Sequence, residues 1–286
     1  MIFYGGRIGN LGFLFSLLVA ILESFKDIYS KGILRDYSPL LLMTNMKILA
    51  SLFLLPFAVL HPQISDYRTF LLVYPINLLL NFFAFYLYFS AIKVSPLSLS
   101  LPMLSFSPVL LIFTSRVMLG EELSGMGILG VFMVFAGSYI LNISKIRVGL
   151  LEPIKAIFKE RGSVYILIVV LIWSITANLD KVGVSSSSPI FWSFSMSLGL
   201  GVLGLLALKF RMSFNFPFLY LSLADTLSTL FQMIAISLIP VPYVISIKRL
   251  SVLFSSLWGI VFLGESANLI GILFMILGGL IIYYHL

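Results

Sequence analysis

VMLGEELSGMGIL (117–129) and VFLGESANLIGIL (261–273) follow one pattern at an offset of 144 residues, and their repetition decides the fold. At the same offset, AIKVSP (91–96) lies over AISLIP (235–240). Two matches in register over this distance indicate an internal duplication of the chain.

The beginning of each half aligns as well, at an offset six residues larger. SPLLL (38–42) falls over SPIFW (188–192), and Lys31 falls over Lys181. A longer loop in the first half accounts for the change of offset. The duplication therefore covers nearly the whole chain.

The composition places this duplicated chain in a membrane. Hydrophobic residues make up 60% of the 286 residues and charged residues only 10%, and the mean hydropathy is +1.11. A soluble domain could not cover so much apolar surface. The apolar segments run to about twenty residues without the short alternation of a membrane β-barrel, which predicts an all-α integral membrane protein.

Ten segments are long enough to cross about 30 Å of hydrocarbon. A polar linker at 144–162 divides them equally, so we expect a first five-helix repeat at 1–143 and a second at 163–286. Because five is an odd number, the second copy enters the membrane from the opposite side, which predicts two inverted repeats around an in-plane pseudo-twofold axis. The expected spans are 10–30, 39–60, 69–91, 96–118, 125–143, 163–182, 189–209, 216–237, 241–263 and 267–284.

Several classes of function are disfavoured by what the sequence lacks. It contains no cysteine and only two histidines, His61 and His285, so we expect no metal site and no cofactor. A membrane-embedded enzyme would need an Asp-rich metal motif or a His/Asp pair at depth, and neither appears. The net charge of +7 reflects loop charges rather than nucleic-acid binding, since about five of the eighteen cations lie in the linker.

The chain resembles the EamA-type transporters of the drug/metabolite transporter (DMT) superfamily. The resemblance rests on Leu119-Gly120-Glu121 and Leu263-Gly264-Glu265, each between an apolar span and a glycine-containing one, and on five plus five spans over nearly the full length. It implies a single-chain carrier of the cell membrane, often an exporter of amino acids or other metabolites. It also implies a central cavity lined mainly by the first, third, fourth, sixth, eighth and ninth spans. The two motif glutamates are expected to act at helix termini rather than in binding.

The orientation in the membrane stays open from sequence. Counting Lys and Arg over alternate loops places the linker in the cytoplasm and both termini outside. Members of the resembled family instead have both termini in the cytoplasm.

Two glycine motifs match a dinucleotide fingerprint but are better explained by helix packing. GMGILG (125–130) and GLGVLG (199–204) lie within apolar spans, with no preceding strand and no acidic residue about twenty positions further on. Small residues at helix spacing let membrane helices approach closely, and we expect that role here.

Two spans carry a stripe of polar residues on one helix face, at spacings of three and four. The repeat places Asn81 over Asp225, so these two positions should face each other across the pseudo-axis. For the asparagines, hydrogen bonding between helices is an equal alternative to substrate contact. The stripes are Asn77, Asn81 and Tyr88 in the third span, and Ser222, Asp225, Thr229 and Gln232 in the eighth.

Charged residues also occur in the first and sixth spans. Glu23, Lys26 and Asp27 are spaced so that one cation lies between two carboxylates on the same helix face, as part of a binding site or as a self-contained ion cluster. Asn178, Asp180 and Lys181 lie at the end of the sixth span, where they either bind a ligand or reach the headgroups.

Lys248 and Arg249 stand side by side inside the apolar run 241–263. Near the middle of a span, each would cost roughly 2.5–3.5 kcal/mol if it faced lipid. We therefore expect Arg249 to clamp a carboxylate or phosphate, while Lys248 pairs with Asp225 or reaches the same ligand. Mutual neutralisation with buried carboxylates is the alternative.

This Lys-Arg pair, followed by Ser255-Ser256, also resembles the ninth helix of sugar-phosphate translocators, which are relatives within the superfamily. Those carriers place a further lysine on the fourth helix, where this chain has Leu104. A carboxylate-bearing metabolite is therefore favoured, and a phosphorylated-metabolite exchanger is the alternative.

The sequence predicts a secondary transporter that exports a small polar or anionic metabolite, such as an amino acid, by alternating access. Transport could be coupled to protons, with Asp225 as the candidate proton site, or to a counter-solute, in a monomer or a homodimer. A passive channel or a non-transporting membrane sensor is the alternative of another class. The predicted substrate-binding residues are Glu23, Lys26, Asp27, Asn81, Tyr88, Asp225, Gln232, Lys248 and Arg249.

Overall fold

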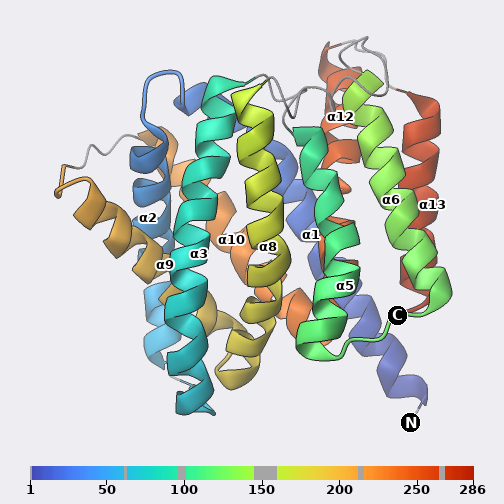
Figure 1. Ribbon diagram of the computed structural model, residues 1–286, viewed down its shortest axis with the longest axis horizontal. Helices are drawn as coiled ribbons and strands as arrows, with labels where there is room; N and C mark the ends of the chain where they lie inside the picture. Colours follow the sequence, from blue (N-terminus) through green and yellow to red (C-terminus); the bar gives the residue numbers. More distant parts are fainter. Residues whose placement is uncertain (1, 61–62, 96–100, 145–159, 212–215, 264–267) are drawn as a thin grey trace.

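The computed structural model describes residues 2–60, 63–95, 101–144, 160–211, 216–263 and 268–286, which form twelve helical segments and no strand (Figure 1). In the first half these are α1 (Ile2–Ile33), α2 (Pro39–Leu60), α3 (Tyr67–Val94), the 3₁₀ helix η1 (Leu101–Phe106), α5 (Ser107–Leu119) and α6 (Gly125–Ser144). In the second half they are α8 (Arg161–Ser186), α9 (Pro189–Ala207), α10 (Phe216–Leu238), α11 (Val241–Lys248), α12 (Ser251–Leu263) and α13 (Leu269–Tyr284).

The segments in the described part of the chain make up ten spans, because η1 with α5 and α11 with α12 each form one interrupted span. Six helices are long and apolar enough to cross a membrane on their own, namely α1, α2, α3, α8, α9 and α10. Many large apolar side chains on these helices remain exposed, including Leu71, Phe83 and Leu171. Such a surface suits a lipid environment. The predicted all-α membrane fold of two inverted five-helix repeats is confirmed.

The packing follows the pseudo-twofold axis. α1 packs along α10, and its repeat mate α8 packs along α3, the mate of α10. α2 packs against its own mate α9, and α6 packs against its own mate α13. The α6–α13 pair lies at one edge of the molecule in Figure 1, away from the α1, α8 and α10 helices at the centre. The centre of the protein is therefore built from both repeats together.

Glycines allow the close approach of α6 and α13. A Cβ atom added at Gly278 would lie 2.7 Å from the carbonyl oxygen of Gly130, and one added at Gly137 would lie 2.7 Å from that of Gly271. These contacts agree with a packing role for Gly130 of the first glycine motif. Gly125 of the same motif has no neighbour within 4 Å.

The fourth and ninth spans are interrupted, so the expectation of continuous helices at 96–118 and 241–263 is wrong. α5 begins at Ser107 directly after η1, and α12 begins at Ser251 after a two-residue turn that follows α11. The two starts are separated by the offset of the repeat, so each repeat breaks its fourth span at the same place.

The two interruptions have different local causes. Pro108 has no N–H to donate to the carbonyl of Leu104, which accepts instead from the Ser107 hydroxyl at 2.8 Å. The second interruption contains no proline. There the Arg249 N–H is shared between the carbonyls three and four residues earlier, at 3.0 and 3.2 Å. This mixed 3₁₀ and α hydrogen bonding tightens the helix without a signal in the sequence.

The first LGE motif ends α5 and ties two other helices to it. Gly120 has a φ of 68°, in the left-handed region that glycine adopts at helix ends. Glu121 accepts a hydrogen bond from Val241 N at 3.0 Å, at the start of α11, and pairs with Lys181 of α8. Gly264 and Glu265 of the second motif, and most of the 144–162 linker, lie outside the described residues.

Candidate functional site

A cavity lies between the two repeats, and its lining contains all nine residues predicted from the sequence to bind substrate. The centres of water-sized spheres can occupy about 120 Å³ of it. The lining comes from α1, α2, α3, η1, α5, α8, α9, α10, α11 and α12. The second and seventh spans therefore contribute as well as the six spans implied by the resemblance. The nine residues are Glu23, Lys26, Asp27, Asn81, Tyr88, Asp225, Gln232, Lys248 and Arg249.

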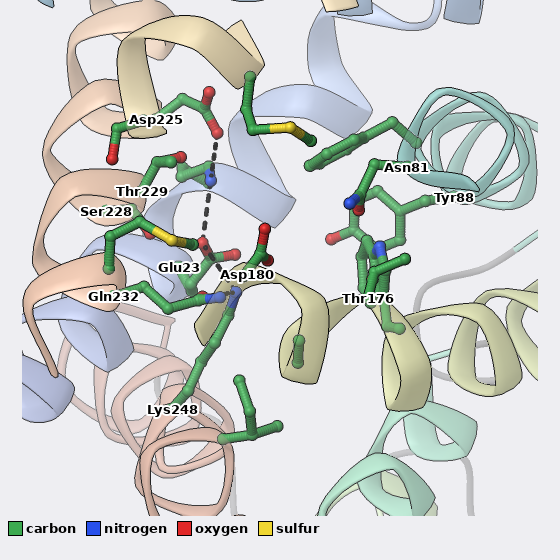
Figure 2. Close-up of a pocket in the computed structure, with 18 of the residues that line it drawn as sticks. Glu23, Asn81, Tyr88, Thr176, Asp180, Asp225, Ser228, Thr229, Gln232 and Lys248 are labelled. Carbon is green, nitrogen blue, oxygen red and sulfur yellow. Dashed lines mark hydrogen bonds and ion pairs between the residues drawn. The ribbon is translucent and has the colours of Figure 1, made fainter. Parts of the chain in front are cut away.

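Five charged side chains form a continuous chain of ion pairs in the cavity wall, which we call the ion chain. Figure 2 labels three of them, Glu23, Asp225 and Lys248. Lys47 Nζ lies 2.7 Å from Asp225 Oδ2, and Lys26 Nζ lies 2.8 Å from Asp225 Oδ1 and 2.9 Å from Glu23 Oε1. Lys248 Nζ lies 3.5 Å from Glu23 Oε1. The ion chain joins α1 and α2 of the first repeat to α10 and α11 of the second.

The ion chain corrects two predicted pairings. Lys248 does not pair with Asp225: its ammonium donates to Gln232 Oε1 at 2.8 Å and faces Glu23. Lys26 bonds Glu23 as expected, but its second carboxylate is Asp225 rather than Asp27. The two lysines on Asp225 satisfy both of its oxygens, which sequence spacing within one helix could not reveal.

Three other predicted residues, Asp27, Tyr88 and Asn81, form hydrogen bonds outside the ion chain. The Tyr88 hydroxyl donates to Asp27 Oδ1, which connects α3 to α1. Asn81 donates to Asn77 at 3.0 Å within α3. Ser222 donates to the carbonyl of Phe218 inside its own helix and is not among the lining residues, whereas Thr229 and Gln232 are. The polar stripe of α10 therefore divides into a packing end and a cavity end.

Arg249 has a different environment from the three lysines. Its Nε and Nη2 atoms donate to Ser107 Oγ at 3.3 and 2.8 Å, so the interruption of the ninth span touches that of the fourth. The residue is 8% exposed. Among the described residues, no carboxylate lies within the 4.0 Å ion-pair distance of its guanidinium. One nitrogen, Nη1, remains without a described hydrogen-bond partner in a cavity wall.

Sequence reasoning missed Lys47 and misplaced Asp180. Lys47 is almost fully buried, pairs with Asp225, and lies 4.4 Å from the centre of the Phe85 ring. A lone lysine in the apolar run of the second span was the available signal. Asp180 does not reach the headgroups: α8 continues to Ser186, and Asp180 lines the cavity.

Asp180 is held by neutral donors. Asn77 Nδ2 and Trp192 Nε1 donate to its Oδ1 at 2.6 and 2.9 Å. Trp192 is fully buried and lies on α9, the helix that follows α8 in the sequence. Asn77 therefore forms a hydrogen bond between α3 and α8, which is the alternative to substrate contact that its sequence position allowed.

Comparison with known proteins gives the family. The sequence pattern of the EamA-like transporter family matches residues 10–143 and again residues 160–284. The chain belongs to the EamA-like transporter family.

This EamA-family chain is also similar to a curated protein in sequence and to a solved structure in fold. An uncharacterized transporter of Archaeoglobus fulgidus is 34% identical over 135 residues, which is 46% of this chain and 48% of that protein. The match thus spans about half the length of this curated relative. A protein of known crystal structure has a TM-score of 0.69 and 15% identity, with 98% of this chain and 97% of that chain covered. At this identity the likeness shows the fold alone.

The two EamA repeats contribute equally to the charge of the cavity. Each supplies two carboxylates and two cations, so the formal charge of the lining is balanced. The first repeat provides Glu23, Asp27, Lys26 and Lys47, and the second provides Asp180, Asp225, Lys248 and Arg249.

Removal of one end of the ion chain should destabilise the protein. Lys47→Met leaves a buried carboxylate with one cation instead of two, which should lower the free energy of unfolding by about 3 kcal/mol. Lys47→Met combined with Asp225→Asn should cost less than the sum of the single variants, because the two groups interact. Thermal unfolding of the detergent-purified variants measures both effects.

The exposed Lys209→Met is the matched control, with an expected change within about 0.5 kcal/mol. Wild-type unfolding of Lys47→Met would show that the Lys47–Asp225 pair contributes little.

Proposed function

We propose that this protein is a secondary transporter, in the cell membrane, of a small metabolite that carries a carboxylate, such as an amino acid. The observation that carries the proposal is the buried Arg249 guanidinium, which faces the cavity without a carboxylate partner among the described residues. A planar guanidinium with a free donor suits a carboxylate ligand. Export is the direction that we expect from the family resemblance.

The helix interruptions favour an anion at the same place. α5 begins at Ser107 and α12 begins at Ser251, and both residues line the cavity. Helix N-termini carry partial positive charge, and transporters with interrupted helices use such ends for anionic substrate groups. Arg249 lies at both interruptions, since it precedes α12 and donates to Ser107.

The size and charge of the cavity favour a small metabolite over a phosphorylated one. The cavity, in which the centres of water-sized spheres can occupy about 120 Å³, suits a compact solute. A doubly charged phosphate would enter a lining that already holds four carboxylates, and only four cations offset them. Leu104, the repeat mate of Lys248, also lines the cavity and supplies no charge.

Alternating access is supported by two lysine contacts at equivalent positions of the repeats. Lys181 donates to the carbonyl of Ile239 at 3.1 Å and pairs with Glu121. Its repeat mate Lys31 donates to the carbonyl of Ser95 at 2.8 Å, and Ser95 is the mate of Ile239. We call these the two lysine latches.

The latches lie at opposite ends of the protein. In Figure 1, α1 and α3 end at the upper edge, whereas α5 and α8 end at the lower edge. Each latch ties the last turns of the first helix of a repeat to the residue that follows the third helix of the same repeat. Release of one latch while the other holds would open the cavity to one side only, as alternating access requires.

Loss of Arg249 should weaken substrate recognition. Hydrogen bonds to charged groups contribute about 1.5–3 kcal/mol, so Arg249→Ala should raise KM for transport by about ten- to hundredfold. Arg249→Lys should not restore it, because a lysine lacks the planar fork. Uptake by proteoliposomes that contain equal amounts of each variant measures this change.

Arg116→Ala, which removes an exposed arginine of α5, is the control for lost charge and should transport normally. Wild-type kinetics of Arg249→Ala would show that the substrate is held elsewhere.

The latches should control access from opposite sides. The chain has no cysteine, so Thr229→Cys in the cavity can be labelled alone with an impermeant maleimide. Lys181→Met should raise the labelling rate from one side, and Lys31→Met from the other, by roughly five- to thirtyfold if a latch contributes about 1–2 kcal/mol.

Arg211→Met, at an exposed position, serves as the control and should leave both rates unchanged. Faster labelling from the same side in both latch variants would contradict the assignment of the latches to opposite gates.

A further inference from the structure

We infer that Asp180 determines specificity by accepting the ammonium group of the substrate, which makes the transporter selective for zwitterions over simple carboxylates. The inference rests on the proposed function and adds a second pole to the site. The substrate carboxylate binds at Arg249, on the ninth span, and the ammonium group binds at Asp180, on α8.

The hydrogen bonds of Asp180 leave one oxygen available. Both Asn77 and Trp192 donate to Oδ1, and among the described residues no donor contacts Oδ2. Asp180 is 9% exposed and lines the cavity. In the close-up, it lies between the Glu23 and Lys248 side chains and those of Asn81 and Tyr88 (Figure 2). The two hydrogen bonds to Oδ1 therefore hold the carboxylate in position, and Oδ2 accepts no hydrogen bond from a described residue.

No cation of the described residues neutralises Asp180 directly. The lysines that act on it electrostatically, Lys47 and Lys248, are beyond the 4.0 Å ion-pair distance. Both are bound elsewhere, Lys47 to Asp225 and Lys248 to Gln232 and Glu23. Burial disfavours an ionised carboxylate in this position, and a cationic partner would offset that cost. A substrate ammonium group supplies that partner.

The other carboxylates of the cavity are less suited to this role. Asp225 uses both oxygens for lysines. Glu23 Oε1 already faces Lys26 and Lys248 and accepts from Ser228. Asp27 has no ion-pair partner among the described residues, but a single neutral donor, the Tyr88 hydroxyl, bonds to it. Among the described lining residues, Asp180 is the carboxylate that has no ion-pair partner and is held in position by two neutral donors.

Pairs of ligands that differ only at the ammonium group test the inference. The purified full chain in nanodiscs is titrated by calorimetry with alanine and lactate, valine and 2-hydroxyisovalerate, leucine and 2-hydroxyisocaproate, and glutamate and 2-hydroxyglutarate. For at least one pair, the wild type should bind the amino acid about ten- to hundredfold more tightly than the hydroxy acid. Asp180→Asn should reduce this ratio to near one, because the amide keeps the shape and the acceptor for Asn77 but lacks the charge.

Asp27→Asn is the matched control, since it removes the other cavity carboxylate that has no ion-pair partner among the described residues. It should shift both affinities together and preserve their ratio. Asn77→Leu, which removes one of the two donors that orient Asp180, should reduce the ratio only in part. Thermal unfolding of each variant separates loss of recognition from loss of the fold.

The outcomes distinguish the inference from the proposed function. Equal binding of amino and hydroxy acids by the wild type, or an unchanged ratio in Asp180→Asn, would overturn the role of Asp180 and leave carboxylate recognition at Arg249 intact. A ratio abolished by Asp27→Asn instead would move the ammonium site to Asp27. Binding of neither class would overturn both the inference and the proposed function.

Discussion

The requirement that buried charges be paired governs the centre of this protein. Taking an ion out of water costs several kcal/mol, and a partner at hydrogen-bond distance must offset that cost. The ion chain meets the requirement between helices of both repeats, from Lys47 on α2 through Asp225, Lys26 and Glu23 to Lys248 on α11. The two halves are therefore held together at the cavity by charge, while their outer surfaces remain apolar toward lipid.

The duplication supplies a symmetric backbone, and the side chains make the site asymmetric. Repeat mates differ where charge is needed: Asn81 corresponds to Asp225, Leu104 to Lys248 and Ser30 to Asp180. All six of these residues line the cavity. An asymmetric solute with one negative and one positive group requires such differences. The symmetric parts, including the helix interruptions and the lysine latches, are those that a two-sided opening mechanism would need in both repeats.

Much of this arrangement could be predicted from the sequence, because duplication and hydropathy are properties of long segments. The repeat offset predicted the inverted five-helix units, and polar residues inside apolar spans identified nine residues of one cavity. The ion pairs between helices could not be predicted from spacing within one helix. Lys26 of α1 pairs with Asp225 of α10, and Lys248 of α11 pairs with Glu23 of α1. The turn before α12 arises from shared hydrogen bonds of Arg249 and carries no proline.

The position of Asp180 shows a further limit of predicting a site from hydropathy. Its place near the expected end of a span suggested the headgroups, but α8 extends to Ser186 and its partners Asn77 and Trp192 come from two other helices. Only the packing of α8 against α3 and α9 places it in the cavity.

Solute counterflow tests the central claim that this cavity is the binding site of a carrier. Proteoliposomes are loaded with an excess of each unlabelled amino acid in turn and diluted into a trace of the same labelled compound. A carrier that binds zwitterions by alternating access predicts, for at least one amino acid, a transient accumulation of label above its equilibrium level. Entry of every compound by simple equilibration, or no entry of any, would contradict the account.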